Sequence, residues 1–163
     1  MIRNATTNDL SRLAEILIFA KRVAYRKIFH DDIVSFNEMQ VVPLALDLQK
    51  EGALDNIIVY DDGIVKGMMN RKITQYGSYE NSLQLCEFYI DPFFQHNGIG
   101  QSMMKAFLNE AVFLHVEYVF LWVLEKNYSA RKFYEKSGFV YDGNRKPENG
   151  TDEYILRYSK TAK

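Results

Sequence analysis

The chain has 163 residues, and its 20 Lys and Arg residues almost balance its 21 Asp and Glu residues, for a formal net charge of −1. This length fits one domain, since domains commonly have about 100–200 residues, and the balanced charge argues against a nucleic-acid-binding protein. Hydrophobic residues make up 47% of the chain and charged residues 25%, which excludes disordered and fibrous classes.

The numbers and positions of cysteine and histidine argue against a disulfide-bonded or metal-binding protein. The single Cys86 excludes an intramolecular disulfide, which is typical of a reducing compartment. His30, His96 and His115 are too widely separated to predict a metal site. The N-terminus lacks the apolar core of a signal peptide, and no run approaches the ~18 apolar residues of a membrane span. The sequence therefore predicts a cytoplasmic protein without a metal or a membrane partner.

The first part of the chain is predicted to be mainly helical. A short strand at 2–5 precedes a capping-box pattern and an amphipathic helix, in which apolar residues recur at helical spacing over 10–24. A second helical stretch should begin near residue 32 and end at Gly52, with an interruption at Pro43, which suits the first position of a helix.

The pattern then changes to the period of β-structure. Strands are expected at 57–60, 64–73 and 83–90, with an Asp-Gly turn after the first and a loop at 75–81 after the second. The later elements are a helix from 99 to 114, a strand at 118–124, a short helix at 128–137 and strands at 139–141 and 153–158. The order β-α-α-β-β-β-α-β-α-β-β predicts a mixed α/β fold around one sheet.

Gly98 and Gly100 lie between a strand and a helix, which is an arrangement suited to phosphate binding. Glycines leave backbone N–H groups accessible, and the helix start adds unpaired N–H groups and a positive dipole end. No Gly-Lys-Ser/Thr follows, which excludes a P-loop, and Met103 stands where a dinucleotide-binding fingerprint needs Gly or Ala. A pyrophosphate cradle of the pattern Gln-x-x-Gly-x-Gly remains, with a tight turn that binds nothing as the alternative.

A second motif follows the apolar strand at 118–124. It reads Asn-Tyr-Ser-Ala-Arg-Lys-Phe-Tyr-Glu-Lys-Ser-Gly-Phe over 127–139, downstream of the loop Gln-His-Asn-Gly-Ile-Gly at 95–100. In this order and at this separation, the two motifs closely resemble the GNAT superfamily of acyl-CoA-dependent N-acetyltransferases. The opening Ile-Arg-Asn-Ala-Thr is also similar to the start of such proteins. The resemblance is strong over 83–139 and architectural elsewhere.

The resemblance implies the GNAT fold, in one acetyltransferase domain over 1–163. In this fold a single mixed, mostly antiparallel central sheet is splayed between its fourth and fifth strands, with helices on both faces. Acetyl-CoA, as co-substrate, would enter the splay, with its pantetheine along the end of the 83–90 strand and its pyrophosphate on the glycine loop. The residues expected at the cofactor are Phe88, Tyr89, Ile90, Gln95, His96, Asn97, Gly98, Ile99, Gly100, Gln101, Asn127, Ala130 and Lys132.

The glycine loop departs from the family pattern in its charge. The family's loop usually begins with Arg or Gln and carries a further basic residue, whereas residues 95–97 are Gln, His and Asn. Cofactor affinity would then rest on backbone N–H groups and the helix dipole. Lys105, Arg131 or Lys132 could contribute at the outer phosphate.

Tyr134 matches the family's tyrosine near the CoA sulfur. A phenol, with an ordinary pKa of about 10, can protonate the thiolate that leaves when the tetrahedral intermediate collapses. The alternative is a core aromatic, because Tyr134 belongs to a helical stripe with Ala130, Phe133 and Ser137. Asn127 matches the family's Asn that hydrogen-bonds the cofactor arm, and it is also a favoured helix cap, so both roles are open for it.

Glu87 is a carboxylate within an apolar strand, on the same strand face as Leu85 and Tyr89. Many members of the family carry Glu at this position before the glycine loop. An amine acceptor arrives protonated, and Glu87 could take its proton directly or through water. Two other roles of Glu87 stay open. It could be a structural acid that pairs with a Lys or Arg of a neighbouring strand, or it could bind the ammonium group of the acceptor.

The predicted function is therefore transfer of the acetyl group of acetyl-CoA to a primary amine, by direct attack in a ternary complex. The alternative is a catalytically silent acyl-CoA-binding regulatory module, against which the presence of Tyr134 argues. The sequence does not name the acceptor, which could be a small molecule or a peptide, and a homodimer is only a family-level expectation. The residues that could shape acceptor specificity are Tyr25, Phe29, Tyr76, Tyr79 and Asp152.

Overall fold

The computed structural model describes residues 1–162, which form two compact units that interleave along the sequence. The first unit comprises residues 1–70 and 87–103, and the second comprises 71–86 and the chain from 104 onward. The strands are β1 (Ile2–Asn4), β2 (Ile57–Asp61), β3 (Val65–Tyr76), β4 (Tyr79–Ile90), β5 (Tyr118–Leu124), β6 (Val140–Pro147) and β7 (Tyr154–Thr161). The helices are α1 (Leu10–Phe29), α2 (Val41–Leu48), α3 (Ile99–Phe113) and α4 (Tyr128–Lys136), with short turns η1 (Thr7–Asp9), η2 (Val34–Glu38) and η3 (Pro92–Phe94).

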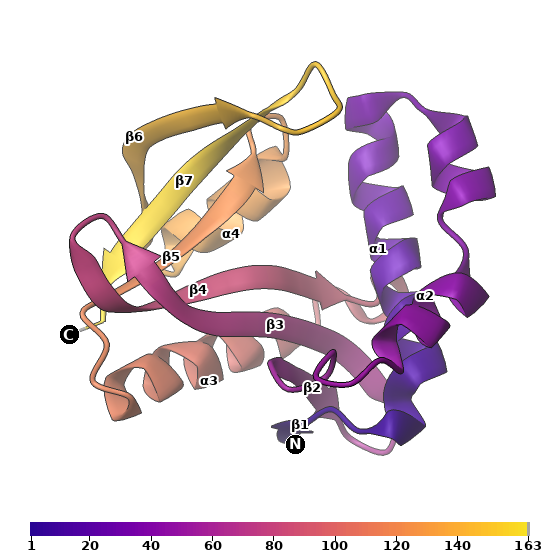
Figure 1. Cartoon of the computed structure of the whole chain (residues 1–163), viewed down its shortest axis with the longest axis horizontal. Coiled ribbons are helices and arrows are strands. Elements are labelled where there is room, and N and C mark those ends of the chain that lie inside the picture. Colours follow the sequence, from indigo (N-terminus) through magenta and orange to yellow (C-terminus); the bar gives the residue numbers. More distant parts are fainter. Residues whose placement is uncertain (163) are drawn as a thin grey trace. The chain divides into compact units, whose positions relative to one another are not determined.

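The sheet has the mixed, mostly antiparallel character that the sequence predicts. Its strand order is β1-β2-β3-β4-β5-β7-β6 (Figure 1). The pairs β1–β2, β2–β3, β5–β7 and β6–β7 are antiparallel, whereas β4 and β5 are parallel. The parallel ladder ends at Leu85↔Leu121, although β5 stays paired with β7 through Leu124.

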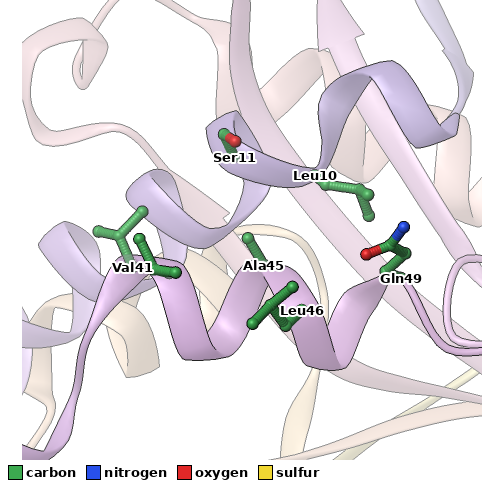
Figure 2. Close-up of a pocket in the computed structure, with 7 residues that line it drawn as sticks. Leu10, Ser11, Val41, Ala45, Leu46 and Gln49 are labelled. Carbon is green, nitrogen blue, oxygen red and sulfur yellow. The ribbon is translucent and has the colours of Figure 1, made fainter.

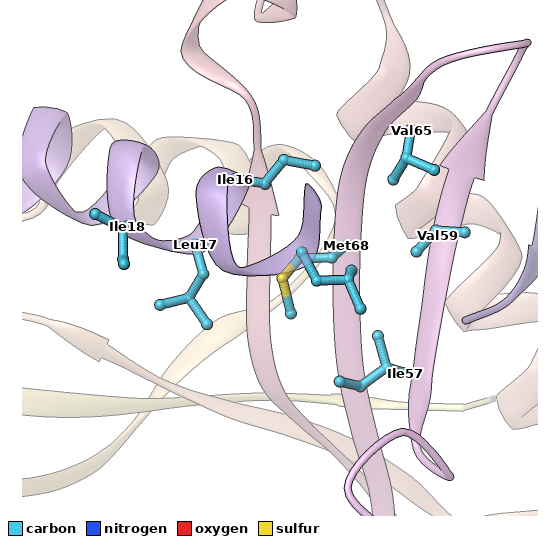
Figure 3. Packing of buried hydrophobic residues seen from close by; sticks show 8 residues of the cluster. Ile16, Leu17, Ile18, Ile57, Val59, Val65 and Met68 are labelled. Atoms are coloured by element: carbon cyan, nitrogen blue, oxygen red, sulfur yellow. The ribbon is translucent and has the colours of Figure 1, made fainter. Parts of the chain in front are cut away.

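The core of the first unit forms between α1 and the β2–β3 hairpin. Leu13, Ile16 and Leu17 of α1 are buried, and they pack with alternating residues of the strands that include Val59 and Met68 (Figure 3). The helical spacing of apolar residues gives α1 one apolar face, and alternation gives the β2–β3 hairpin another. These two faces pack against each other. Burial of each such side chain contributes roughly 1.5–3 kcal/mol.

Helix α2 packs along α1 near the start of the latter (Figure 1). None of its residues is fully buried. Figure 2 shows the groove between these two helices, and the residues that line it are Leu10, Ser11, Val41, Val42, Ala45, Leu46 and Gln49. The helical stretch that begins near residue 32 is interrupted at 39–40, and Pro43 lies within the first turn of α2, where a Pro lacks only an N–H that would have no helical partner.

In the second unit β5 is buried from both sides, as its apolar sequence predicts. Val119 and Leu121 on one strand face and Phe120 on the other are at most 5% exposed. Figure 1 shows β6 and β7 as a hairpin, with α4 between β5 and β6 in the chain. Among residues 1–162, no helix is both long enough and apolar enough to cross a membrane.

Several limits of the predicted elements are wrong. Helix α2 ends at Leu48 and not at Gly52, and the strand expected at 139–141 is β6, which extends to Pro147. The expected loop at 75–81 is almost entirely strand, because β3 continues to Tyr76 and β4 begins at Tyr79 around a turn at Gly77, whose φ is +58°. The rings of Tyr76 and Tyr79 pack on Tyr118, with centroids 5.1 and 4.6 Å away, so tertiary packing holds these residues extended. The helix expected to reach 114 ends at Phe113, and Leu114 is 38% exposed.

Candidate functional site

The predicted site residues fall into two groups, one in each unit. The end of β4 and the glycine loop, which supply Glu87 and residues 88–101, belong to the first unit. The second motif, with Asn127 and Tyr134, belongs to the second unit.

The glycine loop is built mainly from backbone. Residues 95–98 are exposed and connect η3 to α3. Gly98 has a φ of +78°, and a side chain at this position would meet no atom within 4 Å. Glycine is therefore required by the backbone conformation and not by a lack of space. The Gln95 side chain donates from Nε2 to the carbonyl of Ile90 at 3.1 Å, which ties the loop to the end of β4.

The start of α3 presents amides without helical partners. Ser102 N–H donates to the Gly98 carbonyl at 3.0 Å. The amides of Ile99, Gly100 and Gln101 precede this bond, so they have no carbonyl four residues earlier within the helix. Such amides, at the positive end of the helix dipole, suit an anion such as a phosphate.

An ion pair between a buried carboxylate and a half-buried arginine anchors the start of this loop, and the sequence analysis missed it. Asp91 is 2% exposed, accepts from Phe93 N–H at 2.9 Å and pairs with the guanidinium of Arg12 on α1. Arg12 also donates from Nε to the Val65 carbonyl at 2.8 Å. Burial lowers the pKa of Arg12, but hydrogen bonds to Glu15 and Asp91 outweigh burial and raise it overall. In the sequence, the dipeptide Asp91-Pro92 marks only the end of the strand expected at 83–90.

Gly67 of β3 is a second feature that sequence reasoning missed. A Cβ at this position would lie 2.7 Å from Ile90 Cδ1, 3.0 Å from Met103 Sδ and 3.3 Å from the Tyr89 carbonyl. The missing side chain therefore lets the end of β4 and the first turns of α3 pack closely on β3. No local pattern marks this glycine, because the close approach arises only when the elements pack.

Glu87 is half-buried, and its carboxylate is hydrogen-bonded to a neutral partner. Asn70 of β3 donates from Nδ2 to Glu87 Oε2 at 3.2 Å. Within residues 1–162, Glu87 forms no salt bridge, so the Lys or Arg partner of the structural alternative is not present there. Asn70 pairs with Ile57 in the β2–β3 ladder, which places its side chain on the face covered by α1.

Tyr89 lies two residues beyond Glu87 and contacts α1. Its hydroxyl is 3.4 Å from the hydroxyl of Tyr25, and its ring centroid is 5.9 Å from Lys21 Nζ. The ring of Phe29, one helical turn further along α1, packs edge-on against Tyr25 with centroids 6.0 Å apart. The end of β4 and one side of α1 thus form a surface of aromatic rings. This surface also carries the carboxylate of Glu87 and the ammonium group of Lys21.

In the second unit, Asn127 caps α4. Its Oδ1 accepts from Ala130 N–H at 3.2 Å, while its carbonyl accepts from Arg131 N–H at 3.0 Å. The cap uses only the oxygen of the side-chain amide, so Nδ2 is a separate donor for a cofactor. Tyr134 is half-buried, with its ring centroid 5.6 Å from that of Phe133 and 6.1 Å from that of Phe139. This packing is compatible with either of the predicted roles of Tyr134.

The cations proposed for the outer phosphate differ in their contacts. Arg131 donates to the Glu125 carbonyl at 2.8 Å and to the Tyr158 hydroxyl at 3.1 Å. These hydrogen bonds hold its guanidinium group to other residues of the second unit. The hydrogen bond that Arg131 donates to Tyr158 is the main cause of the raised pKa of Arg131. Lys105 and Lys132 are exposed, and neither forms a salt bridge with a residue in the described part of the chain.

The residues expected to shape acceptor specificity are divided between the two units. Tyr25 and Phe29 lie in the first unit, whereas Tyr76, Tyr79 and Asp152 lie in the second. The Tyr76 hydroxyl donates to Asp142 at 2.8 Å and is 2.9 Å from the Ser159 hydroxyl. Burial is the main cause of the raised pKa of Tyr76, and this tyrosine is a structural residue of the β-sheet.

Solved structures share this fold along almost the whole chain. The PaiA N-acetyltransferase of Thermoplasma acidophilum, in complex with coenzyme A, is 19% identical, with a TM-score of 0.70 and 96% of both chains covered. The ribosomal-protein-S18-alanine N-acetyltransferase of Escherichia coli is 17% identical, with a TM-score of 0.65, 99% of this chain and 93% of that chain covered. The putative acetyltransferase yncA of Salmonella typhimurium, with acetyl-CoA, is 16% identical, with a TM-score of 0.67, 100% of this chain and 94% of that chain covered.

Likeness at these identities establishes the fold, and the family follows from a separate match. The acetyltransferase (GNAT) family model matches residues 16–139, a range that includes the glycine loop and the second motif. The chain therefore belongs to the acetyltransferase (GNAT) family.

Proposed function

We propose that this protein is an enzyme that transfers the acetyl group of acetyl-CoA to a primary amine, by direct attack within a ternary complex. The observation that carries the proposal is the order of β4, the exposed glycine loop and α3, with Glu87 in the strand that leads to the loop, in a chain of the GNAT family. The acceptor is a small molecule or a peptide. A catalytically silent acyl-CoA-binding module, in one domain of the same fold, is the competing function.

The cofactor proposal rests on donors in both units. In the first unit, amides from Gln95 to Gln101 would hold the pyrophosphate, and backbone of residues 88–90 would pair with the pantetheine. In the second unit, Nδ2 of Asn127 would donate to the pantetheine arm, with Ala130 and Lys132 also at the cofactor. Two acyltransferase neighbours solved with coenzyme A or acetyl-CoA support this class of cofactor.

Two side chains would move protons. Glu87 would accept a proton from the acceptor ammonium, directly or through water, so that the neutral amine attacks the thioester carbon. Asn70, which donates to Glu87 Oε2, would hold the carboxylate so that Oε1 faces the acceptor. A strand backbone N–H would stabilise the oxyanion, and Tyr134 would protonate the sulfur as the carbon–sulfur bond breaks.

An acceptor panel tests the proposal directly. Acetyl-CoA is incubated with single primary amines, amino acids, polyamines and short peptides, and free thiol is measured over time. Amine-dependent thiol release with at least one acceptor is the expected result. Acetyl-CoA binding in calorimetry, together with no thiol release above the amine-free rate for every acceptor, would instead establish the silent module.

The Glu87→Gln variant tests the proton transfer with the best acceptor. The amide keeps the shape of the side chain and removes the proton acceptor, so kcat/KM should fall most at low pH, where the amine is mostly protonated. At high pH, free amine is abundant and the variant should approach wild type. A raised KM with little change in kcat would identify an ammonium anchor instead. A pH profile parallel to that of wild type would remove Glu87 from the mechanism.

A further inference from the structure

We propose that the acceptor carries an anionic group besides its amine, and that Lys21 of α1 binds that group. The acceptor class would then be an amino acid or a peptide with an accessible carboxylate. The inference rests on the proposed function, because it takes Glu87 as the residue that meets the amine.

Lys21 differs from the arginines of the same helix in its contacts. Arg12 binds two carboxylates, Arg22 donates to two main-chain carbonyls, and Arg26 pairs with Asp32 at 2.7 Å. Lys21 is half-buried, yet within residues 1–162 it forms neither a salt bridge nor a hydrogen bond, and its ammonium group lies over the ring of Tyr89. A partly buried ammonium is most stable with an anionic partner, and the described residues supply none.

The contacts of Tyr89 relate Lys21 to Glu87. Lys21 Nζ lies 5.9 Å from the centroid of the Tyr89 ring. Glu87 lies two residues earlier on the same strand face, a separation of roughly 6–7 Å along the strand. The bond from Asn70, whose register places it on the α1 face, puts the Glu87 carboxylate on that side too. A cation and an anion are therefore available to one bound molecule on a single side of β4.

The signs of these two charges select among acceptors. A molecule whose ammonium meets Glu87 gains a second attraction only if it presents a negative group to Lys21. A diamine would bring a second ammonium toward Lys21, and like charges in a partly desolvated site are unfavourable. An alkylamine would leave the lysine without an anion. Amino acids and peptides carry the required pair of opposite charges.

Three acceptors of equal chain length separate these cases. Butylamine has a neutral tail, 4-aminobutyrate an anionic tail and 1,4-diaminobutane a cationic tail, and kcat/KM is measured for each with saturating acetyl-CoA. Wild type should prefer 4-aminobutyrate over butylamine roughly tenfold, which corresponds to one modest ion pair, and should use the diamine least. Butylamine serves as the reference within each variant, so partial misfolding cancels from the ratios.

The lysine is then altered in two ways. Lys21→Met should reduce the preference for 4-aminobutyrate to near unity, and Lys21→Glu should invert the order in favour of the diamine. Lys27→Met removes the same charge from an exposed position of the same helix and should leave the wild-type ratios unchanged.

Each outcome bears on one of the two proposals. Equal ratios in wild type and Lys21→Met, with measurable turnover of butylamine, overturn the role of Lys21 and leave the acetyltransferase function intact. An equal loss of preference in Lys27→Met also overturns it, because the effect would then belong to the general charge of the helix. Absence of turnover with all three acceptors and the full amine panel overturns the proposed function and this inference together.

Discussion

The two groups of predicted site residues differ in the chemical groups that they offer, which are mainly main-chain groups in the first unit and side chains in the second. In the first unit, the glycine loop at 95–98 is exposed and offers mainly backbone groups. In the second unit, α4 holds its residues by side-chain contacts, which include the Asn127 cap and the aromatic packing of Tyr134. The binding groups of the glycine loop are main-chain amides, so their positions depend on the backbone conformation. In α4 the candidate binding groups are side chains, and the same side chains also pack within the unit.

This difference determines which measurements are informative. Changes in the loop should affect cofactor affinity with little loss of stability, because few side chains there pack on anything. Changes in α4 affect packing and chemistry together, so they need substitutions that remove one polar atom and retain the ring or the cap. The variants below sharpen or break this contrast.

The largest effect is expected from Gly98→Val. A β-branched residue is strained at a φ of +78°, so the loop must change conformation and its amides move away from the phosphates. Acetyl-CoA affinity in titration calorimetry should fall at least ~100-fold, about 2.7 kcal/mol. The free energy of unfolding should fall only by the strain of the left-handed conformation, roughly 1–2 kcal/mol, because the side chain would enter open space and displace no neighbour.

Gly77→Val is the matched control for this strain. Gly77 also has a positive φ, at +58°, and a side chain there would likewise meet no atom within 4 Å. It lies in the β3–β4 turn, so its variant should retain wild-type affinity for acetyl-CoA. Normal affinity in a folded Gly98→Val protein would overturn the cradle assignment.

Tyr134→Phe should lower kcat by roughly 100-fold, since general acids typically contribute 10²–10⁴-fold. The phenylalanine keeps the ring contacts with Phe133 and Phe139, so the unfolding midpoint and the cofactor affinity should stay near wild type. Tyr128→Phe, at an exposed position of the same helix, is the control. Unchanged turnover in Tyr134→Phe would establish the core-aromatic alternative.

A smaller effect is expected from Asn70→Ala, which removes the donor to Glu87 Oε2. Hydrogen bonds to charged groups contribute about 1.5–3 kcal/mol, so kcat/KM should fall roughly tenfold or more. The double variant with Glu87→Gln separates positioning from a general structural role. If Asn70 acts through Glu87, the double variant should be no slower than Glu87→Gln alone, whereas additive losses would contradict this role.

The smallest effect on activity is expected from Asp9→Asn, which lies outside both groups. Hydrogen bonds from Arg3 are the main cause that lowers the pKa of Asp9 from 3.8 to about 2. A pKa lowered by folding stabilises the protein above pH 3.8, and this stabilisation is lost as pH falls through about 2. It amounts to about 2 kcal/mol near neutral pH.

Denaturant unfolding at several pH values tests this contribution. Near pH 7, the free energy of unfolding of Asp9→Asn should lie below that of wild type. The difference should shrink as pH falls below 4 and be lost as pH falls through about 2. The rate of acetyl transfer in the folded variant should match wild type, and a constant difference at all pH values would exclude the ionic contribution.

Local patterns determined the elements of this protein and the identity of its motifs. The apolar strand at 118–124 agrees in both limits with β5, because an apolar run bounded by polar residues has one stable arrangement in a buried sheet. The glycine loop was also visible from sequence, since strand, Gly-x-Gly and helix are contiguous. The extended residues at 75–81 were not, because stacking on Tyr118 holds them and that residue is remote in the chain.

The partners of the site residues were decided only by tertiary structure. The sequence alone indicated that Glu87 needs a reason to lie in an apolar strand, but not that Asn70 supplies its hydrogen bond. The Arg12–Asp91 pair and the close approach at Gly67 likewise join segments that are far apart in the chain. The periodicity and spacing of residues determine the local secondary structure of a segment. A hydrogen bond between strands depends on their register, which the packing of the whole core sets.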